Sequence, residues 1–229
     1  MDLWDLLRSS AGSMQGAGDG DLEAPPTLHP VPLDLVHDAA PGETVTARTM
    51  NGSYRDFVLT EHSVSELDFP GIPDDVRGVE GRGVCSRALW QHNADHPQEF
   101  ARYAQVWPLT WLWVWRESTA PTASEDVPRA FDWMGRALTA EDRPAPRVPM
   151  RAQDAGPLSG REVIVRRYVD GDGPAGSLHS RIAVGEVLES ADGFEVPCQT
   201  IEDYYASELD AWRRHDYMLF PVQRVWVRV

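Results

Sequence analysis

Cys85 is the side chain whose surroundings most resemble those of a reactive nucleophile. It follows Gly81-Arg82-Gly83-Val84, where we predict that it occupies the first turn of a helix beside Arg82 and Arg87. A helix dipole and neighbouring cations favour the thiolate, which is the reactive form of cysteine. A hydrolase or transferase that uses Cys85 is therefore one hypothesis. The simpler interpretation is a small buried cysteine on an apolar stripe.

Such an enzyme needs a histidine from another part of the fold. His92 lies seven residues further on, which is about 10 Å along a helix, too far for a hydrogen bond to Cys85. The remaining bases are His37, His62, His179 and His215, with an acid such as Asp170 to orient the ring. We name His179 as the candidate partner of Cys85, but we do not assign either residue as catalytic.

Metal and cofactor motifs are incomplete in this sequence. His92 and His96 are four apart, but His96 precedes Pro97 and is pushed out of the helical region, and no third ligand stands at a usual zinc spacing. Asp170-Gly171-Asp172-Gly173 begins like a calcium loop, yet Pro174 occupies the third ligand position. The chain has no lysine, which excludes Schiff-base chemistry and the lysine-containing phosphate loop. We expect no metal and no cofactor.

Tryptophan is unusually frequent, with nine residues in the chain. Val106 to Glu117 is the most apolar run, and we predict one strand in which Trp111, Trp113 and Trp115 share a face. Both faces of this strand are largely apolar, which is typical of the middle of a covered sheet. The three indoles are a binding site only if they are exposed to solvent; otherwise they belong to the core.

The charge balance favours a protein partner over nucleic acid. There are 36 acidic and 21 basic residues, a formal net charge of −15 and a pI near 4.8. Nucleic-acid affinity depends on cations that neutralise phosphates, so we expect no direct DNA or RNA binding. Plain solubility is the simplest explanation of the acidity, and recognition of a basic partner is the alternative.

No run of about 18 apolar residues predicts a membrane span. The start of the chain, MDLWDLLRSS, carries an acid where a secretion signal carries positive charge. Two cysteines are too few for a disulfide scaffold. The expected compartment is the cytoplasm.

The elements that must position these residues follow from local signals. Asn51-Gly52 predicts a hairpin between 43–50 and 53–60. We predict four helices, over 84–92, 95–107 and 124–138 and from the cap Thr200 onward. Strands are expected over 161–169, 178–188 and 193–198, and then over 217–220 and 222–229. Without a βαβ rhythm, the predicted class is α+β with mainly antiparallel sheets.

Proline clusters divide the predicted fold. Residues 1–41 are expected to form a flexible or extended, proline-rich N-terminal arm. Residues 42–142 form an α+β subdomain around the tryptophan strand, and 158–229 form a hairpin, helix and strand subdomain; one continuous domain is the alternative.

Three functions remain open. The first is a cytoplasmic, non-enzymatic interaction protein whose acidic surface binds a basic protein, such as an inhibitor of the immunity type. The second is the Cys85 enzyme. The third is a structural component of a larger assembly that uses the proline-rich arm to reach a neighbour.

Overall fold

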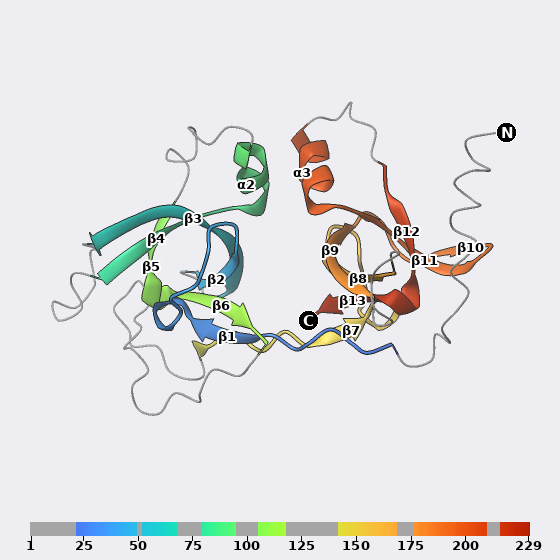
Figure 1. Cartoon of the computed structure of the whole chain (residues 1–229), viewed down its shortest axis with the longest axis horizontal. Helices are drawn as coiled ribbons and strands as arrows, with labels where there is room; N and C mark the ends of the chain where they lie inside the picture. The colour runs from blue at the N-terminus through green and yellow to red at the C-terminus, as the bar shows by residue number, and fades with distance from the viewer. Residues whose placement is uncertain are drawn as a thin grey trace.

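Two antiparallel β-sheets form the computed structural model of this chain (Figure 1). It describes residues 22–49, 52–67, 79–94, 105–117, 142–168, 176–209 and 216–229. Thirteen strands and two α-helices lie in these ranges. The prediction of an α+β protein with four helices is therefore wrong, and the chain is mostly β. The mainly antiparallel pairing agrees with the prediction.

The first sheet has six strands in the order β1-β6-β2-β3-β4-β5. Their bounds are β1 (His29–Pro32), β2 (Thr44–Arg48), β3 (Tyr54–Leu67), β4 (Val79–Cys85), β5 (Gln105–Pro108) and β6 (Leu112–Arg116). The hairpin between β2 and β3 confirms the Asn51-Gly52 signal. Gly52 has a φ of 82°, and its N–H donates to the Thr49 carbonyl at 2.9 Å.

The second sheet has seven strands and follows the first in the chain. Its strands are β7 (Pro149–Arg151), β8 (Glu162–Arg167), β9 (Ser177–Ala183), β10 (Leu188–Ser190), β11 (Gly193–Gln199), β12 (Met218–Pro221) and β13 (Val225–Arg228). The strands expected over 193–198 and 217–220 are confirmed. Of the strand expected over 222–229, Val225–Arg228 forms β13 and Val222–Arg224 forms a 3₁₀ turn.

Each sheet carries one α-helix, α2 (Arg87–Ala94) or α3 (Ile201–Leu209). Ser86 and Thr200 cap these helices, because their hydroxyl oxygens accept hydrogen bonds from the N–H groups of Leu89 and Asp203. The helix from Thr200 was predicted, and the one near Cys85 begins later than expected. Of the helix expected over 95–107, residues 105–107 belong to strand β5. Its remainder and the helix expected over 124–138 lie outside the described residues.

The tryptophan run is two strands separated by a turn of 3₁₀ helix, so the prediction of one continuous strand is wrong. Pro108 ends β5, the turn η4 (Leu109–Trp111) follows, and β6 starts at Leu112. Pro32 and Pro221 precede equivalent turns, η1 (Leu33–Leu35) and η7 (Val222–Arg224). The fixed φ of proline suits the residue before such a turn.

The two sheets have the same strand order. The order β7-β13-β8-β9-β11-β12 in the second sheet matches β1-β6-β2-β3-β4-β5 in the first. Strands β9 and β10 together take the place of the long strand β3, because Leu188 of β10 lies opposite Glu195 as Val64 of β3 lies opposite Gly81. A 3₁₀ turn, η6 (Ala152–Asp154), follows β7 as η1 follows β1. We call the two halves unit 1 (residues 29–117) and unit 2 (residues 148–229).

Residue registers coincide in the two units. Val45 lies opposite Val114 in unit 1, and Val163 lies opposite Val227 in unit 2. Gly42, with a φ of 91°, donates its N–H to the carbonyl of Leu59; Gly160, with a φ of 78°, donates to that of Ala183. Because both strand order and register agree, the chain contains two copies of one structural unit. Each copy has its own apolar core.

An extended, proline-containing segment precedes each unit and crosses to the other one. Arm 1 (residues 22–28) accepts hydrogen bonds from unit 2: Arg151 donates to the Leu22 carbonyl and Arg166 to the Glu23 carbonyl. Arm 2 (residues 142–147) contacts unit 1, where Arg48 pairs with Asp142 at 2.9 Å. Arg48 and Arg166 hold the same register position, so the exchange is reciprocal.

The arms pair with each other where they cross. The N–H and carbonyl groups of Leu28 and Arg147 exchange two hydrogen bonds, of 3.0 and 2.8 Å. These residues hold the same position before their units, so a local two-fold axis passes between them. Helices α2 and α3 contact each other on the opposite side of the molecule (Figure 1). Residues 22–41, expected as a separate arm, thus supply arm 1, β1 and η1.

Candidate functional site

Cys85 is the last residue of β4, and it lines a hollow of about 780 Å³ in unit 1. The thiol is buried, and this burial raises its pKa to about 11, although Arg87 acts in the opposite direction. Cys198 is also buried, with a pKa raised to about 12 by loss of solvent. Both thiols are therefore protonated at neutral pH, and nothing described here prepares Cys85 as a thiolate.

The described histidine candidates belong to three different segments of the fold. His179 belongs to β9 of unit 2, and its Nε2 is 2.8 Å from the hydroxyl oxygen of Ser177. His37 and His62 are exposed, in the loop after η1 and in β3. His215 and Asp170 lie outside the described residues. Within the described part of the chain, no group of three or more His, Cys, Asp or Glu residues forms a metal site.

The tryptophans named as a conditional binding site are largely covered. Trp113 and Trp115 are buried on the outer face of β6, and Trp111 is partly buried in η4. The Arg147 guanidinium of arm 2 lies 3.9 Å from the Trp115 ring centroid, and Tyr54 meets Trp113 edge to face. Arm 2 and Tyr54 therefore cover the tryptophan side chains that a ligand would have to contact on this face.

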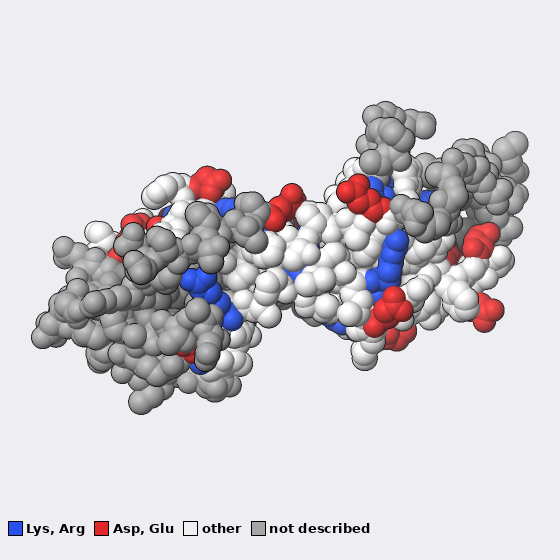
Figure 2. Space-filling view, turned by 90° about the horizontal axis from the view of Figure 1, so that it is seen from below, with Lys and Arg blue, Asp and Glu red and all other residues white. Residues whose placement is uncertain are grey.

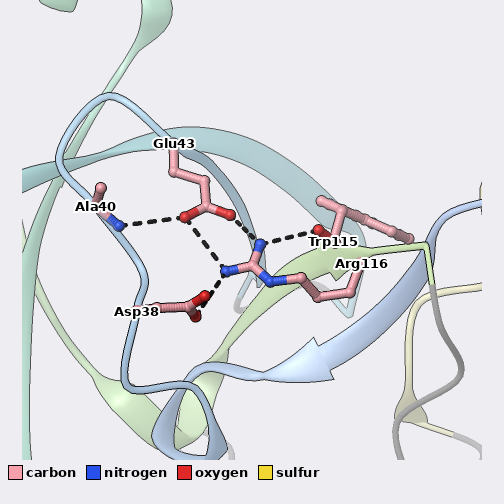
Figure 3. A network of polar contacts seen from close by, with 5 residues as sticks. All are labelled: Asp38, Ala40, Glu43, Trp115 and Arg116. Carbon is pink, nitrogen blue, oxygen red and sulfur yellow. Dashed lines mark hydrogen bonds and ion pairs between the residues drawn. The ribbon is translucent and has the colours of Figure 1, made fainter.

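A charged network closes the end of β6 (Figure 3). The guanidinium of Arg116 pairs with Glu43 and approaches Asp38 at 3.4 Å, and it donates to the Trp115 carbonyl. The Glu43 carboxylate also accepts from the N–H of Ala40. Bonding to Glu43 raises the pKa of Arg116. These charges satisfy one another, so the network holds the loop before β2 against β6.

Three of the exposed large apolar side chains lie on one face at the edge of unit 2. Leu188 of β10 and Leu219 of β12 are 46% and 44% exposed, and Tyr217, just before β12, is 54% exposed. Leu188 lies opposite Glu195, and Leu219 lies opposite Pro197, so strand alternation puts all of them on the outer face. We call Leu188, Tyr217 and Leu219 the apolar edge.

Acidic residues border the apolar edge. Glu195 is the cross-strand partner of Leu188, and Asp216 directly precedes Tyr217. Glu189 and Asp192 are exposed on β10 and in the turn between β10 and β11. An apolar centre with a charged border is the usual composition of a protein-binding surface. Strand β12 is also the end strand of its sheet among the described strands, with β11 as its neighbour.

Unit 1 covers the equivalent surface with its own chain. Its register equivalents of Glu195 and Pro197 are Gly81 and Gly83. A Cβ at Gly81 would collide with Leu67 of the long strand β3 and stand 2.8 Å from Val106. A Cβ at Gly83 would collide with Thr60. The two glycines therefore leave room for side chains of β3 to lie across its neighbour β4, where unit 2 carries the side chains of Glu195 and Pro197.

No family model matches this chain, and no curated protein or solved structure is significantly similar to it. No α-helix in the described residues is long and apolar enough to cross a membrane. The geometry of the two units is therefore the basis for any function.

Sequence reasoning missed the apolar edge because exposure depends on the fold. The signal that was available is the duplication itself. Gly42-Glu-Thr-Val-Thr-Ala-Arg48 and Gly160-Arg-Glu-Val-Ile-Val-Arg166 share glycine, valine and arginine at the same places, and Trp113 matches Trp226. Aligning the copies would have shown that Gly81 and Gly83 stand where Glu195 and Pro197 occur.

Proposed function

We propose that this protein is a non-enzymatic interaction protein that binds a basic protein partner through the apolar edge of unit 2. The observation that carries the proposal is the gathering of Leu188, Tyr217 and Leu219 on one outer face, bordered by acids, at the free end of a sheet. Exposed apolar clusters of this kind are typical of binding surfaces.

The kind of partner follows from charge. The chain carries a net charge of −15, and Glu195 and Asp216 stand directly beside the apolar side chains. On the face shown in Figure 2, a short stripe of basic residues runs over each unit, and acidic side chains lie next to the stripe of unit 2. Such a surface attracts a cationic protein and speeds its association at low salt.

The mode of binding follows from strand β12. An end strand offers backbone N–H and carbonyl groups to an added strand, and its neighbouring side chains select the sequence that binds. The proposed ligand is therefore an extended segment of the partner that has apolar side chains and arginine or lysine residues. Neutralising a basic effector in the cytoplasm is the form of this function that we favour.

The Cys85 enzyme gains no support from the described residues, because the thiol pKa is raised and His179 lies in the other unit. The assembly component was to use the proline-rich arm, and arm 1 is bound to unit 2 of the same chain. The basic-partner proposal is the one that a specific surface favours.

The test compares the wild-type chain with Leu188→Ser plus Leu219→Ser. Leu35→Ser is the matched control, since Leu35 is 46% exposed in unit 1. Proteins captured by the wild-type chain at low salt are identified, purified and titrated by calorimetry. We expect a basic protein whose affinity falls about 10-fold or more in the double variant and also falls with added salt. A partner that binds the double variant and the Leu35→Ser control equally well would contradict the proposal.

A further inference from the structure

The hollow in unit 1 has the size of a small-molecule site. It is an open depression of about 780 Å³ between the β2–β3 hairpin, the start of α2 and strand β5. Pockets that hold small ligands usually have about 300–1,000 Å³ and combine apolar walls with a few polar groups. The apolar edge belongs to unit 2, so the hollow is a separate feature of the molecule.

Aromatic rings form one wall of the hollow. The rings of Phe57 and Trp107 lie 5.4 Å apart with an angle of 45° between their planes. The Trp107 indole is held in place because its N–H donates to the Gln105 side-chain oxygen. Two fixed rings at this spacing suit contact with a third aromatic ring.

The charge of the hollow is opposite to that of the whole protein. Arg55 alone carries a charge among the described residues that line it, in a chain with a net charge of −15. Its guanidinium carbon lies 5.5 Å from the Phe57 ring centroid, and no ion pair joins it to another described residue. Cys85 adds a neutral thiol to the wall, since burial raises its pKa to about 11.

We propose that the hollow binds a small molecule in which an aromatic ring stands next to a carboxylate. The ring packs against Phe57 and Trp107, and the carboxylate accepts hydrogen bonds from the Arg55 guanidinium above the Phe57 ring. Arginine binds carboxylates through paired, charge-assisted hydrogen bonds. The carboxyl end of a polypeptide that finishes in phenylalanine presents the same chemistry.

Unit 2 has a different residue at each of these three positions. The residues at the register positions of Arg55, Phe57 and Trp107 are His179, Arg181 and Phe220. A site that arose with the shared architecture would have left its residues in both copies. The hollow is therefore a specialisation of unit 1, as the apolar edge is of unit 2.

Phenylacetate and phenylacetamide are the probes, because they differ only in the carboxylate. Each is titrated into the full-length protein, and binding is followed by NMR at the indole N–H of Trp107, assigned with Trp107→Phe. We expect phenylacetate to bind at least about 10-fold more tightly than phenylacetamide. Comparison with N-acetylphenylalanine, which resembles a chain end, shows whether the carboxylate comes from a free small molecule or from a polypeptide.

Arg55→Gln is the decisive variant, and Arg181→Gln is its matched control in unit 2. Both arginines lie on equivalent strands, β3 and β9. Arg55→Gln should weaken phenylacetate about 10-fold and leave phenylacetamide unchanged, while Arg181→Gln should change neither by more than about 2-fold. Equal binding of the two probes, equal effects of the two variants, or no binding at Trp107 would each overturn the inference.

Discussion

Units 1 and 2 share a strand order and a register but present different surfaces. In unit 1 side chains of the long strand β3 lie across its neighbour β4, which requires Gly81 and Gly83. Unit 2 has the two strands β9 and β10 in place of β3 and carries Glu195 and Pro197 at those positions. The features that the two units share form the fold and join its two halves. We therefore look for function where the units differ.

The largest predicted effect tests what the units share. Trp113 and Trp226 are buried at the same position on β6 and β13, and Arg151 lies over the Trp226 ring at 4.4 Å. Trp113→Ala and Trp226→Ala should each lower the free energy of unfolding by about 3–5 kcal/mol, because each removes a buried indole. Urea denaturation measures this. The exposed control Leu35→Ala should change it by less than about 0.5 kcal/mol. A large loss of unfolding free energy in only one of the two tryptophan variants would contradict the structural equivalence of the units.

A smaller effect should separate the units. Gly81→Ala places a methyl group against Leu67 and should lower the free energy of unfolding by about 1–3 kcal/mol through overpacking. Glu195→Ala, at the same register position in unit 2, should change the free energy of unfolding by less than about 0.5 kcal/mol, because it shortens a partly exposed side chain and adds no overlap. The same denaturation experiment measures both variants, and equal losses at both positions would contradict the close approach of Leu67 to Gly81.

The smallest effect concerns the two thiols. Burial raises the pKa of Cys85 to about 11 and that of Cys198 to about 12, from an ordinary value of 9.0. Because the unfolded chain loses these protons first, the thiol contribution to stability is complete below pH 9 and is lost as pH rises through the folded values. Denaturation between pH 8 and 11 should show less alkaline loss in Cys85→Ala and Cys198→Ala than in the wild type. A larger alkaline loss in either variant would contradict the raised pKa values.

Local signals in the sequence predicted the elements that local chemistry determines. Asn51-Gly52 indicated the β2–β3 hairpin, and Thr200 indicated the start of α3, because a positive φ and a helix cap depend on a few neighbouring residues. The single strand through Trp111 was wrong because Pro108 and a 3₁₀ turn interrupt it. Apolar spacing that suits a helix also occurs in strands, which explains the excess of predicted helix around Trp107.

The duplication leaves only a weak signal in the sequence, and the exposed surfaces could not be located without the fold. The copies keep few identities, such as Gly42 with Gly160 and Pro25 with Pro144, and insertions of different length separate them. That Cys85 lines a hollow and that Leu219 is exposed depends on contacts between strands far apart in the chain. Composition gave the acidic character, but it does not show which part of the surface is apolar.

A disulfide across the crossing of the two arms tests the central claim, that this chain is two copies of one unit joined by exchanged arms. Leu28→Cys and Arg147→Cys are combined in a chain with Cys85→Ala and Cys198→Ala, since Leu28 and Arg147 face each other in an antiparallel bridge. Mass spectrometry after mild oxidation should find one internal disulfide in a monomeric protein. Two free thiols, or a disulfide that links two molecules, would contradict the account.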